Sequence, residues 1–221
     1  IHSELHEKYY SNPYYFAPAA RTYHKYITDW QADFQVEIGK NHAKYFDKNG
    51  WLYFTKEVFD LFYPSYGDTY PTFTGAIGMT YEQGGHSRGG RGIITPNYDT
   101  LTLLDRVTHH RTTALSTVEV ASENSDRLID NFGSYYQESQ RNPKGKYKTY
   151  IIKGDNPKGK LLALTKLLDK NGIRYGRTGS TSVSAYDYQD GSNTSVSISG
   201  DDLIISAYQP LSTLTQVLMD P

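Results

Sequence analysis

The chain of 221 residues contains no cysteine, which excludes disulfide bonds and thiolate metal sites. It also lacks any apolar run long enough to span a membrane. Lysine and arginine number 23 against 24 aspartates and glutamates, so the net charge is only −1. A charge this close to zero gives no support for a nucleic acid or an anionic membrane as partner.

Tyrosine is the abundant residue, with 21 copies. Its ring is apolar and its hydroxyl is hydrated, so tyrosine-rich surfaces often line clefts that bind peptides or sugars. The alternative is that these rings fill the core of a sheet-rich fold. The length accommodates one large domain or two modest ones.

Two long segments carry the apolar period of a helix. The first, 22–48, should end at Asn49-Gly50, where glycine supplies a left-handed cap. The second, 97–141, has a possible interruption at Ser122–Ser125. Its periodic positions are Leu101, Leu104, Val107 or Thr108, Arg111, Leu115, Val118, Ala121, Leu128 and Phe132. Between the two segments, 51–54 predicts a short strand and 56–62 one or two helical turns.

The polar segment Asn142–Lys146, with its proline and glycine, predicts a boundary between domains at 1–141 and 146–221. The pattern that follows is strand, helix and strand, which indicates a parallel, right-handed β-α-β unit. The chain is therefore expected to be α/β throughout. The elements expected in the second domain are strands at 147–153, 173–175 and 202–208, helices at 158–170 and 211–219, and a loop or weak hairpin at 178–199.

The chemistry is concentrated in 62–96. The apolar run Ala76–Tyr81 predicts a buried strand, and Glu82 follows where that strand should end. A glycine-rich loop with Arg88 and Arg91 comes next. An acid at a strand end beside a polar loop is where α/β enzymes place catalytic groups. Glu82 is thus either a turn-capping residue or a general base.

Other chemistries have weaker support. Arg88 and Arg91 would suit a substrate carboxylate or simply be solvated. The glycines are not followed by Gly-Lys-Ser/Thr, and no serine sits in a nucleophile elbow. His2 and His6 are four residues apart, but Ser3 stands where zinc proteases have glutamate. The remaining histidines are expected to be structural or exposed: His24, His42, His86, His109 and His110.

Met79-Thr80-Tyr81-Glu82, the glycine-rich turn, Gly92–Pro96 and the long helical segment after it resemble the zinc metallocarboxypeptidases, the carboxypeptidase A-like family. At the other end, His6 and the Tyr14-Tyr15-Phe16 run are similar to the third zinc-ligand strand of large bacterial members, with His2 as the alternative ligand. The resemblance covers roughly residues 1–140. Residues 146–221 resemble the extra α/β domain that follows the catalytic region in those members.

The resemblance implies a three-layer, mixed-sheet catalytic domain acting on peptide substrates. Zn²⁺ held by His6 and two upstream residues would polarise the scissile carbonyl, and Glu82 would take a proton from water and pass it to the leaving amine. Tyr63 or Tyr66 would close over the substrate. Export to the periplasm or the extracellular space is implied by the family alone.

The sequence departs from the family in one respect. The first two zinc ligands of the family lie in a His-x-x-Glu motif, and this chain contains none. We therefore expect the C-terminal portion of a longer enzyme, metal-free and inactive by itself, because a catalytic zinc needs three protein ligands. The alternative is a non-catalytic module that keeps the fold and binds peptide or glycan in a tyrosine-lined groove.

Overall fold

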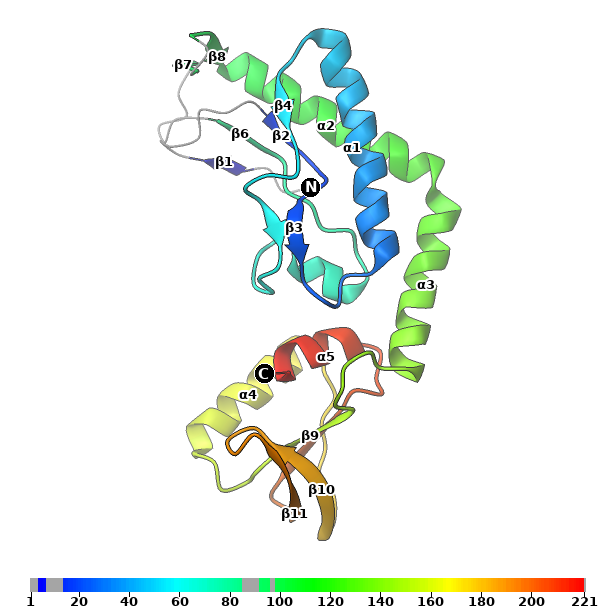
Figure 1. Cartoon of the computed structure of the whole chain (residues 1–221), viewed down its shortest axis with the longest axis vertical. Coiled ribbons are helices and arrows are strands. Elements are labelled where there is room, and N and C mark those ends of the chain that lie inside the picture. The colour runs from blue at the N-terminus through cyan, green and yellow to red at the C-terminus, as the bar shows by residue number, and fades with distance from the viewer. Residues whose placement is uncertain (1–3, 7–13, 85–91, 96–97, 221) are drawn as a thin grey trace. The chain divides into compact units, whose positions relative to one another are not determined.

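The computed structural model describes every residue except 1–3, 7–13, 85–91, 96–97 and 221. The chain combines α and β structure in two compact units, 1–132 and 133–221 (Figure 1). The two units meet within helix α3 (Ser125–Arg141), ahead of the linker predicted at 142–146. Among the described residues, no helix is long and apolar enough to cross a membrane.

Two capped helices form one side of the first unit. Helix α1 (Asp29–Asn49) begins at Thr28 through a capping box with Gln31, and Gly50 ends it with φ 67°, as predicted. Helix α2 (Leu103–Glu123) begins with the equivalent exchange between Thr102 and Asp105. The interruption predicted at 122–125 is confirmed, since α2 ends at Glu123, with Asn124 as its C-cap, and α3 begins at Ser125.

A mixed sheet packs against these helices in the order β1-β6-β2-β4 (Figure 1). β1 runs parallel to β6, β6 antiparallel to β2, and β2 parallel to β4. The four strands are β1 (Glu4–His6), β2 (Tyr14–Tyr15), β4 (Tyr53–Phe54) and β6 (Glu82–Gly84). Two further pairs lie outside this sheet: β3 (Ala20–Tyr23) with β5 (Asp60–Leu61), and β7 (Gly92–Ile94) with β8 (Thr100–Thr102). A short 3-10 helix, η1, spans Tyr70–Thr74.

Four local predictions in this unit are wrong. The second helix begins at Leu103 and not at residue 97, because Thr100–Thr102 pairs as β8 with β7. The first helix does not begin at residue 22, because Ala20–Tyr23 pairs as β3. Residues 56–62 are not helical, since Lys56 and Val58 adopt positive φ values of 61° and 64° before β5. Residues 76–81 are not a strand: the carbonyls of Ala76 and Gly78 accept hydrogen bonds from glutamine side chains of α1. Glu82 therefore begins its strand instead of following one.

The second unit contains a helix-covered strand pair and a separate hairpin. Its elements are β9 (Thr149–Ile152), α4 (Lys158–Lys170), β10 (Thr181–Asp187), β11 (Ser192–Ile198), β12 (Leu203–Ser206) and α5 (Ser212–Met219). Both helices, the hairpin and the strand near 203 agree with the sequence. The parallel β-α-β unit does not, because 173–175 forms no strand and β9 pairs antiparallel with β12.

The Asp202 side chain connects the end of β9 to the turn before β12 through hydrogen bonds. Its buried carboxylate accepts hydrogen bonds from the amides of Gly154 and Ser199 at 2.7 and 2.9 Å, and from the Lys153 ammonium. These contacts, the lysine first, lower the pKa of Asp202 to about 2. The side chain thus satisfies two backbone donors that would otherwise be left without a partner.

Replacing Asp202 with alanine is expected to destabilise the second unit by roughly 2–4 kcal/mol, because it strips acceptors from a lysine and two amides. Faster hydrogen exchange of the β9 and β12 amides would measure the loss. Asp201→Ala is the matched control: the Asp201 side chain is 91% exposed and its ion pair with Arg177 is long, so little change is expected. Equal effects of the two substitutions would contradict the assignment.

Candidate functional site

Glu82 lies at the start of β6, in the interior of the four-stranded sheet. The β1–β6 register places Glu4 opposite Glu82 and His6 opposite Gly84. On the other side, Glu82 is the antiparallel partner of Tyr15. The Glu82 side chain is only 2% exposed. The backbone of position 6 thus lies on the strand adjacent to Glu82, two register steps further along.

Alternation along the chain assigns Glu82 to one face of the sheet. Gln83, the next residue of β6, contacts α2 through His109 at 2.7 Å, and Tyr14, the neighbour of Tyr15 in β2, contacts it through Thr113 at 2.8 Å. Successive side chains of a strand point to opposite faces. Glu82 therefore lies on the face away from α2, beside its register partner Tyr15.

An aromatic group borders Glu82 on that face. The Tyr15 ring packs against Phe54 and Phe59, with centroids 5.2 and 4.4 Å apart. Tyr15 itself is 1% exposed. A carboxylate in such surroundings is poorly hydrated.

A second polar cluster lies on the helix side of the sheet, along the buried face of α2. Four of the five buried α2 residues are polar or charged: they are Arg106, His109, Thr113 and Ser116, with Val120 the exception. These positions recur at the helical period. The same period was visible in the sequence, but hydrophobic patterning assigns a buried face to apolar residues and so missed this one.

Three histidines share this interior. His109 Nδ1 donates to Gln83, His110 Nδ1 lies 2.7 Å from the Tyr14 hydroxyl, and His42 Nδ1 lies 2.7 Å from Ser116 Oγ. Burial lowers the pKa of each imidazole to about 4; the charges of His109 and Arg106 lower that of His110 further, and Asp105 opposes the shift at His109. The three rings are therefore neutral at pH 7.

The same interior raises the pKa values of two tyrosines. Burial holds the pKa of Tyr14 far above its usual value of 10 and raises the pKa of Tyr81 to about 12. Tyr14 also bonds Thr113 at 2.8 Å. The cluster consists of neutral, hydrogen-bonded groups around the buried Arg106, and it is separated from Glu82 by the sheet. The expectation that His109 and His42 are structural is consistent with this placement.

The remaining predicted site residues are placed only in part. Tyr63 and Tyr66 are 55% and 56% exposed, and their rings touch each other with centroids 5.2 Å apart. His2, Arg88 and Arg91 lie outside the described residues, and His6 is described by its strand pairing alone. The structure therefore brings the backbones of positions 6 and 82 together.

Within the described part of the chain, no three histidine, aspartate or glutamate side chains are grouped so as to hold a metal ion. Comparison of the chain with protein-family models, with curated proteins and with solved structures finds no match.

Proposed function

We propose that this chain carries the third-ligand strand and the general base of a zinc metallocarboxypeptidase, which releases C-terminal residues from peptides. The observation that carries the proposal is the parallel pairing of β1 with β6, which sets position 6 on the strand next to Glu82. This arrangement fits the pairing of ligand strand and glutamate strand that the family resemblance implies. The mixed sheet and its helical cover are compatible with the same family.

Among the residues that the structure describes, no three histidine, aspartate or glutamate side chains are grouped so as to hold a metal ion, whereas a catalytic zinc takes three protein ligands. The proposal therefore takes one ligand, His6, from the strand next to Glu82 and the others from outside the described residues. The chain alone is accordingly proposed to be inactive.

The role proposed for Glu82 follows from its surroundings. A carboxylate held at the start of a strand, 2% exposed and opposite Tyr15 on the neighbouring strand, has little freedom to reorient. Such a group accepts a proton from water on one side of the substrate and returns it to the departing amine. The exposed Tyr63–Tyr66 pair is proposed to contact the peptide.

Glu82→Gln tests this role in a longer polypeptide that includes the upstream ligands. Hydrolysis of a chromogenic C-terminal substrate is expected to fall at least about 100-fold, because a general base contributes 10²–10⁴-fold. Chelator should abolish the wild-type rate. Zinc content, measured by elemental analysis, should stay at the wild-type level, which separates loss of the base from loss of the metal. Asp130→Asn, on the exposed surface of α3, is the control. An undiminished rate in the Glu82→Gln variant would contradict the proposed role of Glu82.

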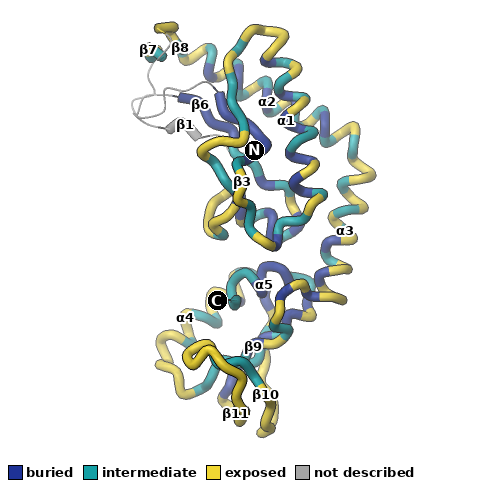
Figure 2. The backbone as a smooth tube through the Cα atoms, in the orientation of Figure 1, coloured by how far each residue is buried: buried dark blue, intermediate teal, exposed yellow. Residues whose placement is uncertain are grey.

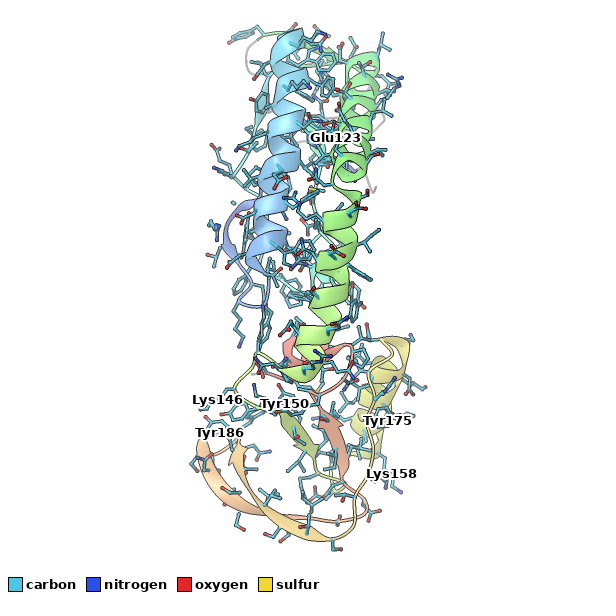
Figure 3. All side chains as sticks on the ribbon, turned by 90° about the vertical axis from the view of Figure 1, so that its right-hand side faces the viewer. Glu123, Lys146, Tyr150, Lys158, Tyr175 and Tyr186 are labelled. Atoms are coloured by element: carbon cyan, nitrogen blue, oxygen red, sulfur yellow. The ribbon has the colours of Figure 1, made fainter. Side chains whose placement is uncertain are left out.

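A second candidate, a peptide- or glycan-binding module, is favoured by one observation in the second unit. The rings of Tyr147, Tyr186 and Tyr188 lie within 5.3 to 5.9 Å of one another, and the Lys146 ammonium lies over two of them. Figure 3 shows Lys146 beside Tyr186 at the edge of that unit. Tyrosine faces with an adjacent cation suit sugar rings or peptide carboxylates. Binding of a peptide or glycan that survives Glu82→Gln but is lost with Tyr186→Ala would favour this candidate.

A further inference from the structure

Helix α2 presents an apolar stripe to solvent. Leu104, Val107, Leu115 and Val118 are 74%, 56%, 54% and 58% exposed. At 100° per residue they fall in one narrow sector, and with Arg111 between them they follow three- and four-residue steps. We call these five residues the outer stripe of α2. Figure 2 shows buried and exposed positions interleaved along this helix.

The stripe is the reverse of the usual arrangement, because the opposite side of α2 is both buried and polar. His109 and Ser116 belong to that buried side, and their hydrogen bonds to Gln83 and His42 fix the rotation of the helix. Turning α2 to bury its leucines would break these bonds and expose the neutral imidazoles. The outer stripe is therefore a fixed property of the packed unit.

An aliphatic seam with three- and four-residue steps is the surface that another amphipathic helix covers. Four large aliphatic side chains in one row on an exposed helix exceed the scattered apolar residues normal for a surface. α1 already packs on α2 from another side, through Asn41 and His42. The outer stripe is thus a second, separate helix-packing surface of α2.

The charge on the stripe selects the occupant. Arg111 lies midway between Leu104 and Val118, is exposed, and makes no ion pair with any residue that the structure describes. A second copy docked antiparallel about the middle of the stripe would set Arg111 against Arg111. A helix with a carboxylate at its centre would pair with Arg111 instead.

We propose that the outer stripe of α2 is the docking surface for an amphipathic partner helix, with aliphatic residues at heptad spacing and a central carboxylate. The proposal does not depend on the chemistry of Glu82. The aliphatic residues of the outer stripe and of the partner helix supply the buried area. The ion pair between Arg111 and the partner's carboxylate fixes the register of the two helices. A partner helix with a central cation is rejected by like-charge repulsion.

Two synthetic helical peptides test the proposal on the 221-residue chain. Both carry leucine at the a and d positions of three heptads; the central flanking residue is glutamate in one and lysine in its twin. In fluorescence anisotropy, the glutamate peptide is expected to bind at least ten-fold more tightly than the lysine peptide. Arg111→Glu should reverse that preference, and Leu115→Lys should abolish binding of both.

Leu162→Lys, at a 55% exposed leucine on α4, is the matched control and should bind as wild type does. Unchanged far-UV circular dichroism confirms that each variant is folded. Equal affinity for the two peptides, or no binding of either, overturns the proposal. So does self-association in sedimentation that Leu115→Lys abolishes, since the occupant would then be a second copy.

Discussion

Gly78→Ala is expected to lower the free energy of unfolding of the first unit by more than about 3 kcal/mol, at or beyond the upper end of ordinary overpacking. A Cβ at this position would lie 1.6 Å from the Asp68 carbonyl oxygen and 2.7 Å from its carbon. Both are backbone atoms, so no change of side-chain rotamer can relieve the clash. The carbonyl of Gly78 also accepts from Gln35 at 2.8 Å, so any backbone shift breaks a buried hydrogen bond.

Gly39→Ala should have a similar effect for the same reason. Its Cβ would meet the Ala17 carbonyl oxygen at 2.2 Å, where α1 crosses the segment after β2. The loss opposes the gain in helix propensity, about 1 kcal/mol for glycine to alanine, and outweighs it.

Urea unfolding followed by tryptophan fluorescence measures both effects, because Trp30 and Trp51 both belong to the first unit. Gly67→Ala is the matched control, since nothing lies within 4 Å of its Cβ. That variant is expected to unfold at the wild-type urea concentration or slightly above it. If Gly78→Ala shows the same midpoint as Gly67→Ala, the close approach of the two backbones is wrong.

The helices could be predicted from the sequence where their ends carry local signals. Gly50 ends α1, and Lys158–Lys170 was delimited correctly by its leucines and the Asn171-Gly172 stop. Residues 76–81 could not be predicted in the same way. Their apolar run resembles a strand, but the donors that satisfy its carbonyls are Gln31 and Gln35, which are distant in sequence. Side-chain partners of this kind leave no local pattern.

The candidate site was found in part for a similar reason. Glu82 was identified from its position between an apolar run and a glycine-rich loop, and its proximity to position 6 depends on one strand pairing. The polar interior of α2 was not found. The aliphatic residues of that helix have the stronger period, yet they form the outer stripe. The opposite face is buried because it makes specific hydrogen bonds with Tyr14 and Gln83. Hydrophobic periodicity identifies a helix, but not which of two contrasting faces is buried.

Acid is expected to unfold the first unit well above the pH at which carboxylates alone would do so. The pKa values of His42, His109 and His110 are lowered to about 4 in the folded chain, against about 6.5 when unfolded. Between pH 4 and 6.5 the unfolded state binds more protons than the folded state. The free energy of unfolding therefore rises with pH in this range and is lost as the pH falls from about 6.5 towards 4. The Asp202 carboxylate, with a pKa of about 2, does not contribute in this window.

The magnitude is large because the three groups act together. A difference of up to three bound protons gives a slope of up to about 4 kcal/mol per pH unit. Between pH 6.5 and 4 the three groups together remove up to about 10 kcal/mol. A first unit with a stability of about 5–10 kcal/mol, within the typical range, should therefore unfold with a midpoint between about pH 4 and 6. His42 adds a specific reason: its buried Nε2 has no hydrogen-bond partner among the described residues, so a proton there would be left unsatisfied.

Trp51 provides the readout, since its ring lies 4.5 Å from that of His109. Its fluorescence should change with the acid transition, and His109→Gln, which retains a donor for Gln83, should reduce the slope by about one proton. His24→Asn is the control, because His24 is only half-buried and outside the α2 interior. A wild-type midpoint below about pH 3.5 would show that the three imidazoles are protonated without cost in the folded state, and the buried polar face of α2 would then have to be hydrated.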